Sequence, residues 1–184
     1  MAKAETTIPG AFLSVLARLA DAFSAYEETT GRPAILVGGA AVAIHTDGAF
    51  MSADFDILAL DDDGFFRAMD HAGFLRDPAA GHGLGGWYHP DHPEYAVEQV
   101  SGSFFDGRGD RHRCLRLQIS DKSIVLASAE DMIADRLGQH AVSQGDDIML
   151  EQARLLYSIS KDLDEDYLLK RIVDEGGKPD LLGL

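Results

Sequence analysis

The sequence has one cysteine, Cys114, among its 184 residues, so no internal disulfide can form. No apolar run approaches the ~20 residues that a membrane-spanning helix needs. Residues 1–10 have no basic-then-apolar pattern of the kind that signal peptides carry. These absences exclude a disulfide-stapled fold, predict no membrane association, and favour the reducing environment of the cytoplasm.

Basic residues are also scarce. Sixteen Lys and Arg stand against 31 Asp and Glu, which gives a net charge of −15. Tight binding to DNA or RNA without sequence preference depends on neutralising phosphates, so this charge argues against it. Arg108, Arg111, Arg113 and Arg116 form the one basic cluster. It is either a solvated arginine-rich hairpin or the lining of a local substrate groove, which a tRNA substrate would require.

The chain is long enough for one domain, or for a core with a helical appendage. Apolar spacing predicts a helix that ends before Gly31, then a strand, a short helix, a strand and a helix, with a loop at 76–86. Further strands are predicted at 86–89, 95–100, 113–119 and 123–126, and helices at 128–142, at 146–160 and from 164. Ser128 is predicted to cap the helix at 128–142, with Asp131 as the acidic residue three positions later. We therefore expect an α/β (α+β) core over 1–127 with a mixed sheet, and a helical bundle over 128–184.

The most informative segment is an apolar strand that runs into Gly38-Gly39, followed by a strand that carries Asp54 and Asp56. Residues two apart in a strand share a face, so the two carboxylates point the same way, while Phe55 points into the core. Adjacent carboxylates repel unless a divalent cation such as Mg²⁺ lies between them. A glycine turn at a helix start offers backbone N–H groups to a phosphate. Both features together indicate a metal-bound nucleoside triphosphate (NTP).

This pattern resembles the nucleotidyltransferase superfamily of polymerase-beta-like proteins, whose signature is a strand, a Gly-Gly or Gly-Ser turn, a short helix and a strand with Asp-x-Asp. The segment from Gly38 to His45 is similar to the Gly-Gly-x-Ala-x-x-x-His of small bacterial members related to abortive-infection toxins. These often continue with Arg-x-Thr-x-Asp-x-Asp. Here Ser52 stands at the Thr position and Phe50 where Arg is common, which removes a positive charge from beside the phosphates.

The resemblance implies that Asp54 and Asp56 ligate Mg²⁺ or Mn²⁺ and that a nucleoside monophosphate passes from an NTP to an acceptor hydroxyl. A protein, a tRNA and a small molecule all stay open as the acceptor. A third carboxylate is expected on a neighbouring strand, and Glu98 is the best candidate, as a metal ligand or a base. The alternative for Glu98 is an exposed strand acid.

Nucleotide binding is assigned to four residues. Gly38 and Gly39 would cradle phosphates, and Ser52 would donate its hydroxyl to a phosphate oxygen or simply lie at the surface. By the resemblance, Arg136 would reach the phosphates from the helix at 128–142. No acidic residue stands three or four positions from Arg136, which favours a tertiary role over an ordinary helical ion pair.

Other residues with chemical potential support weaker hypotheses. His82, His89 and His92, near Asp91, could form a zinc site of a metal-dependent hydrolase, although their spacing matches no established motif. Core packing is the commoner fate for His45, and also for Trp87 and Tyr88, which could otherwise stack on a base.

A further alternative is a binding protein that keeps the nucleotidyltransferase fold and has lost transfer. Phe50 in place of Arg, and Glu98 in place of the usual Asp, favour this reading. Such a protein would act as a nucleotide sensor, or as a toxin–antitoxin component with a protein partner.

Overall fold

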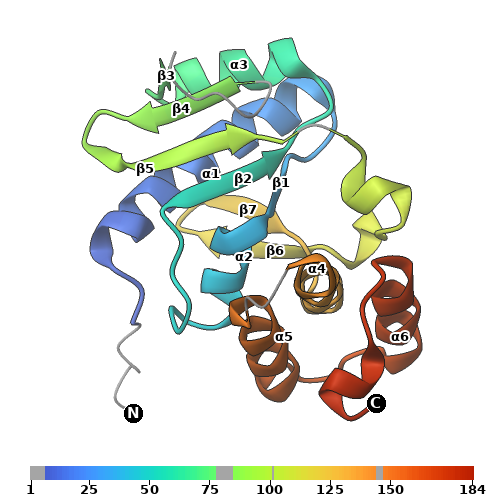
Figure 1. Ribbon diagram of the computed structural model, residues 1–184. Helices are drawn as coiled ribbons and strands as arrows, with labels where there is room; N and C mark the ends of the chain where they lie inside the picture. Colours follow the sequence, from blue (N-terminus) through green and yellow to red (C-terminus); the bar gives the residue numbers. More distant parts are fainter. Residues whose placement is uncertain (1–6, 78–84, 101, 144–146) are drawn as a thin grey trace. The chain divides into compact units, whose positions relative to one another are not determined.

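The computed structural model describes residues 7–77, 85–100, 102–143 and 147–184 (Figure 1). The chain forms two compact units. The sheet unit comprises Met1–Gly102 and Cys114–Leu126, and the helical unit comprises Ser103–Arg113 and Ala127–Leu184. The helical unit thus combines an internal segment with the C-terminal third of the chain. No helix of the described residues is long and apolar enough to cross a membrane.

Helix α1 (Gly10–Thr30) opens the sheet unit. Its buried side chains recur every three to four residues, from Phe12 to Tyr26, which gives the helix one apolar face. The helix ends where Gly31 adopts a left-handed backbone with φ of 69° and donates its N–H to the carbonyl of Glu27. The glycine thus ends the helix where the sequence predicts.

Seven strands within the described residues form one mixed sheet, in the spatial order β3-β4-β5-β2-β1-β7-β6. They are β1 (Ile35–Val37), β2 (Asp54–Leu58), β3 (Leu75–Asp77), β4 (Gly85–His89), β5 (His92–Gln99), β6 (Leu115–Ile119) and β7 (Lys122–Leu126). The central strand β2 is antiparallel to β1 and parallel to β5. The predicted mixed α/β sheet is confirmed.

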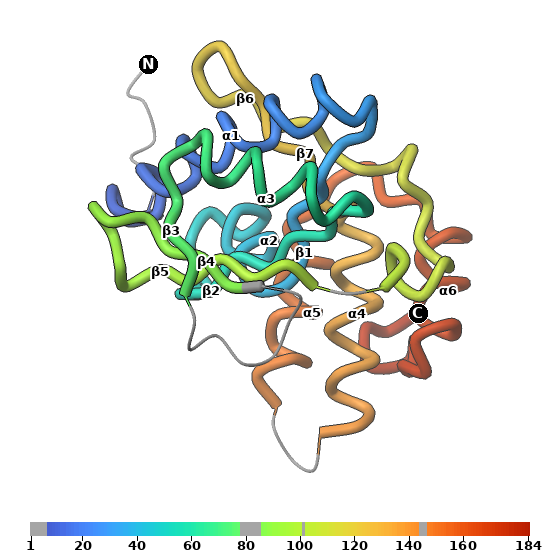
Figure 2. Tube along the Cα trace, turned by 90° about the horizontal axis from the view of Figure 1, so that it is seen from above, coloured from blue at the N-terminus to red at the C-terminus, as the bar shows by residue number. Residues whose placement is uncertain are grey.

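α1 and α3 (Asp62–His71) lie on one face of the sheet (Figures 1 and 2). Aromatic side chains pack both helices against it. The ring centroids of Phe12 on α1 and Phe55 on β2 are 4.6 Å apart. The buried Tyr26 hydroxyl accepts hydrogen bonds from the backbone N–H groups of Leu60 and Asp61, each at 3.0 Å. These contacts fix β2, and with it the two aspartates, to a rigid layer.

One strand was missing from the expectations. β3 overlaps the start of the predicted 76–86 loop and pairs antiparallel with β4. Its Arg76 guanidinium covers the rings of Phe66 and Trp87, at 4.3 and 5.3 Å from their centroids. The stacked Arg76 side chain covers these apolar rings, as an apolar side chain would in most strands. A strand can therefore form here although its sequence is polar. The remainder of that loop, 78–84, lies outside the described residues.

The helical unit contains α4 (Ala129–Val142), α5 (Ile148–Ile159), α6 (Glu165–Asp174) and a 3₁₀ turn at Pro179–Leu182. α4 packs against both α5 and α6. The Ser128 hydroxyl accepts the N–H of Asp131, so the predicted serine cap of α4 is confirmed. The internal segment contributes two 3₁₀ turns, Phe104–Gly107 and Arg111–Arg113. The second turn is the reason that β6 begins at Leu115 rather than at residue 113.

Candidate functional site

The acidic strand β2 has the predicted alternation. Phe55 and Ile57 are fully buried. Asp54 is exposed and Asp56 is half-buried. The two carboxylates therefore occupy the face of β2 opposite to the one that packs on Phe12.

Glu98 lies directly beside this pair. In the parallel ladder between β2 and β5, Asp56 is the register partner of Glu98, and Phe55 is the partner of the buried Val97. Register partners on adjacent strands share a face and stand about 4.8 Å apart in the hydrogen-bonding direction. The sheet thus brings Asp54, Asp56 and Glu98 onto one face.

Gly38 is the point at which β1 turns into the short helix α2 (Gly38–His45). Its φ of +65° favours glycine, and a Cβ atom there would stand 1.9 Å from Oδ2 of Asp56. No side chain can occupy that space while Asp56 keeps its position. Gly38 and Asp56, which are 18 positions apart in sequence, are therefore immediate neighbours.

Gly39 stands in the same relation to Ser52. A Cβ atom at Gly39 would lie 2.7 Å from the Ser52 hydroxyl oxygen, closer than real Cβ contacts. That oxygen also accepts the N–H of Asp54 at 3.2 Å and donates to the carbonyl of Asp54 at 3.1 Å. The two glycines thus contact two different members of the predicted site.

The electrostatics of this region favour cations next to the carboxylates and an anion at the helix start. α2 begins at Gly38 without a side-chain cap, since the residue before it is Val37. The first N–H groups of a helix and its dipole attract anions such as phosphate. In the described part of the chain, no Lys, Arg or His forms an ion pair with Asp54 or Glu98.

The donor chemistry of the three carboxylates fits Mg²⁺ or Mn²⁺, which prefer oxygen ligands. As they stand, the described residues contain no group of three or more His, Cys, Asp or Glu side chains arranged to hold a metal ion. Mg²⁺ is commonly bound by one or two carboxylates together with substrate phosphates and water, rather than by a complete protein cage.

Arg136 belongs to the helical unit, where its side chain is 6% exposed. Its guanidinium donates to one carboxylate oxygen of Asp135, from Nε at 3.0 Å and from Nη2 at 2.5 Å. Nη1 makes longer contacts, at 3.4 Å, with Gln152 and with the sulfur of Met149 on α5. Helical spacing did not predict this ion pair with the adjacent residue, which forms because a long arginine side chain can fold back onto its neighbour. A role at the phosphates stays a prediction.

The arginines of the predicted cluster have separate partners within their own units. Arg108 donates to the backbone carbonyl of Asp174, and Arg116 forms an ion pair with Glu27 at 2.9 Å. Arg113 donates to Asp164 at 2.7 Å. The Tyr167 N–H and Arg113 together hold the pKa of the Asp164 carboxyl below its usual value. Each of these arginines has a local acceptor, which favours structural roles.

The described histidines near β4 contact neighbouring side chains of the sheet unit. His89 is 7% exposed and packs edge-on against Phe74, with ring centroids 5.4 Å apart. His92 lies 3.5 Å from the Glu94 carboxylate. His82 is outside the described residues.

Trp87 is 1% exposed and is the centre of the aromatic core, so it does not wall a surface pocket. Tyr88 and His45 are half-buried.

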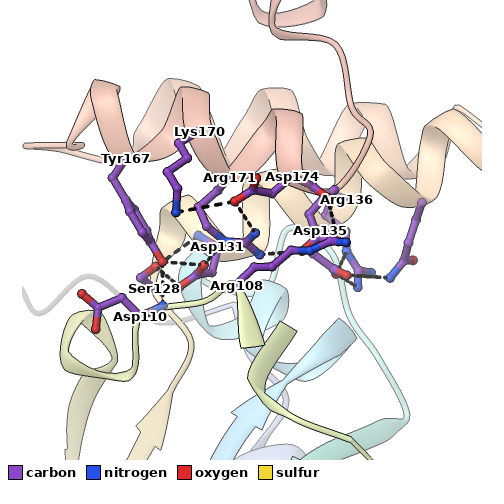
Figure 3. A network of polar contacts seen from close by, with 12 residues as sticks. Arg108, Asp110, Ser128, Asp131, Asp135, Arg136, Tyr167, Lys170, Arg171 and Asp174 are labelled. Carbon is purple, nitrogen blue, oxygen red and sulfur yellow. Dashed lines mark hydrogen bonds and ion pairs between the residues drawn. The ribbon is translucent and has the colours of Figure 1, made fainter. Parts of the chain in front are cut away.

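Sequence reasoning missed a buried network in the helical unit (Figure 3). Asp131 accepts from Arg171 Nε at 2.8 Å and from the Tyr167 hydroxyl at 2.9 Å. Arg171 and Asp131 are both fully buried. Burial raises the pKa of Tyr167 to about 12. Asp131 was recognised only as a helix-cap position, and Arg171 had no sequence signal because its partner is 40 residues away.

Comparison with known proteins adds the fold family. No family model matches the sequence, and no curated protein is detectably similar to it. Several solved structures are similar to this chain. The crystal structure of ANT(2'')-Ia in complex with adenylyl-2''-tobramycin has a TM-score of 0.57 and 12% identity, over 88% of this chain and 98% of that one. The solution structure of ANT(2'')-Ia, described as an antibiotic-resistance factor, has a TM-score of 0.54 and 12% identity, over 87% and 90%.

The third is an antigenic nucleotidyltransferase-like protein from Paracoccidioides brasiliensis. It has a TM-score of 0.58 and 14% identity, and the match covers 89% of this chain and 86% of that one. Identities this low show the fold alone, and nothing in the three matches distinguishes the toxin-related members. The chain has the nucleotidyltransferase fold.

Proposed function

We propose that this protein transfers a nucleoside monophosphate from an NTP, held with Mg²⁺ or Mn²⁺, to a hydroxyl of a small-molecule acceptor. The observation that carries the proposal is the arrangement of three carboxylates on one sheet face beside the Gly38 turn. The fold is that of nucleotidyltransferases, and one protein that shares it was solved with a nucleotidylated small molecule, adenylyl-2''-tobramycin. The net charge of −15 disfavours a polyanionic acceptor such as tRNA.

The proposal assigns a role to the three carboxylates and to the glycine turn. Asp54 and Asp56 hold the divalent cation, with Glu98 as a third ligand or as the base. The first N–H groups of α2, at Gly38 and Gly39, face a phosphate of the NTP. When bound, the cation neutralises charge on the triphosphate and on the leaving pyrophosphate.

The transfer itself is a displacement at the α-phosphorus. The acceptor oxygen bonds to this atom, the bond to the oxygen that bridges to the β-phosphate breaks, and pyrophosphate leaves. The hydroxyl proton passes to a carboxylate, for which Glu98 is the candidate because it lies beside Asp56 in the register. To accept this proton, the Glu98 carboxylate must lie within hydrogen-bonding reach of the acceptor hydroxyl.

A second candidate is a nucleotide-binding protein without transfer activity. Phe50 stands where an arginine is common, and no Lys, Arg or His of the described residues forms an ion pair with Asp54 or Glu98. Such a protein would bind an NTP and act through a partner. The two candidates differ in one product, since only transfer releases pyrophosphate.

Thermal unfolding tests nucleotide binding for both candidates. Wild type, the double variant Asp54→Asn/Asp56→Asn and the control Asp63→Asn/Asp70→Asn are heated with each NTP, with and without Mg²⁺ or Mn²⁺. The control removes two exposed acids from α3 and so matches the change in charge. Ligand at 100 times its Kd stabilises the native state by about 2.7 kcal/mol.

We expect a metal-dependent rise in Tm for wild type and the control, and none for the double variant. Pyrophosphate release in the presence of hydroxylated small molecules then separates transfer from binding alone. No rise in Tm with any NTP would remove both candidates.

A further inference from the structure

The backbone of Asp54 lies just beyond the end of its neighbouring strand. β1 pairs with β2 from Ile35 opposite Leu58 to Val37 opposite Asp56. Continued by two residues, this register would place Gly39 opposite Asp54. The chain instead turns at Gly38 and starts α2, so Gly39 is helical. The strand that would have bonded to Asp54 is therefore missing at this point.

The N–H and C=O groups of Asp54 face this missing strand. In a parallel ladder, alternate residues direct their backbone groups to the same neighbour. Ala53 and Ile57 are directed to β5, because their carbonyls accept the N–H groups of Ala96 and Val100 at 2.9 Å each. Asp54 is an odd number of positions from both residues, so its backbone groups are directed to the opposite side, toward β1. Its backbone donor and acceptor thus need another partner.

The Ser52 hydroxyl supplies that partner. Its oxygen accepts the Asp54 N–H at 3.2 Å and donates to the Asp54 carbonyl at 3.1 Å. A hydroxyl can donate and accept at one atom, as the missing backbone residue would have done with two. The same oxygen would lie 2.7 Å from a Cβ atom at Gly39, which places it in the space that opens where the strand turns away.

We propose that Ser52 is a positioning residue that replaces the missing strand partner of Asp54 and thereby holds the Asp54 carboxylate in line with Asp56. This inference rests on the proposed function, because it takes Asp54 as a metal ligand. It differs from the phosphate contact expected from the sequence. The single hydroxyl proton is already donated to the Asp54 carbonyl, so it is not directed to a phosphate oxygen.

The test is a titration with Mn²⁺ alone, without nucleotide, of wild type, Ser52→Ala, Ser52→Thr and the control Ser14→Ala. Ser14 is exposed on α1, where its hydroxyl donates to the carbonyl of Gly10. Loss of a partner that orients a metal ligand weakens metal binding by about 10-fold or more. We expect this loss in Ser52→Ala, recovery in Ser52→Thr, which keeps the hydroxyl, and no change in Ser14→Ala.

Hydrogen exchange of the Asp54 amide gives a readout that needs no metal. In Ser52→Ala this amide loses its acceptor, so we expect its exchange to accelerate by about 10-fold, the factor for one net hydrogen bond. Unchanged Mn²⁺ affinity and unchanged exchange in Ser52→Ala, with weaker NTP binding, would overturn the proposal and restore the phosphate contact. If wild type binds no Mn²⁺ in the absence of nucleotide, the cation site requires the substrate phosphates, and amide exchange then decides the role of Ser52.

Discussion

The two units of the molecule differ in how their most notable charged side chains are arranged. In the helical unit, Asp131 and Arg171 are both fully buried and neutralise each other at 2.8 Å. In the sheet unit, Asp54, Asp56 and Glu98 share one face of two neighbouring strands, so like charges are gathered there. Buried opposite charges fix a structure, whereas gathered like charges cost stability and are retained when a ligand neutralises them. The sheet unit is therefore where we locate chemistry.

The largest expected effect comes from breaking the buried pair. Arg171→Leu leaves Asp131 as an uncompensated buried charge, which should lower the free energy of unfolding by about 3–5 kcal/mol. Arg116→Leu is the matched control, because it removes an arginine from an exposed ion pair with Glu27 and should cost less than about 1 kcal/mol. Urea unfolding measures both. Equal losses in the two variants would contradict the distinction between buried and exposed charge.

A second comparison isolates the contact between Gly38 and Asp56. Gly31 and Gly38 have nearly equal φ values, +69° and +65°, but only Gly38 has a neighbour within 4 Å of the added Cβ. Alanine at either position should cost about 1–2 kcal/mol through the left-handed backbone. Gly38→Ala must in addition displace the Asp56 carboxylate, so we expect a larger loss of stability and the loss of Mn²⁺ binding. Gly31→Ala with an equal loss of metal affinity would argue against the contact.

The pH dependence of stability should identify Tyr167. Its pKa is raised from 10.0 to about 12 in the folded protein, chiefly by burial. A raised folded-state pKa stabilises the native state fully below pH 10, and this stabilisation is lost as the pH rises through about 12. The contribution is about 1–2 kcal/mol after allowance for partial exposure. Denaturation between pH 9 and 12 should show this loss in wild type and a smaller one in Tyr167→Phe.

The smallest effect on stability should come from the candidate site. Asp54→Asn removes one of three like charges at an exposed position, so the free energy of unfolding should change by less than about 1 kcal/mol or rise slightly. Metal binding should fall at the same time. A variant that loses stability as Arg171→Leu does would show that Asp54 is structural.

Local chemistry made much of the sheet unit predictable. Period-two alternation located β2 and β5, and Gly31 marked the end of α1. In the helical unit, Ser128 marked the start of α4 in the same way. Family resemblance led us to expect Glu98 on a strand next to the aspartates, since no local pattern determines which strands become neighbours. The register that pairs it with Asp56 came from the structure.

The features that the sequence did not predict depend on long-range contacts. β3 was missed because Arg76 covers aromatic rings that come from α3 and β4. The partner of Arg171 is 40 residues away, and the fold of Arg136 onto Asp135 depends on the helix packed against it. The hydroxyl of Ser52 has a positioning role only because β1 ends two residues early, which the sequence does not show.

The most direct test of the central claim is calorimetric titration of a non-hydrolysable NTP analogue into wild type and Asp54→Asn/Asp56→Asn, with Mg²⁺ or with EDTA. We predict binding by wild type in Mg²⁺, its loss in EDTA, and no binding by the double variant in either condition. Equal affinity with and without metal, or binding that survives the double substitution, would contradict a metal–nucleotide site at these carboxylates.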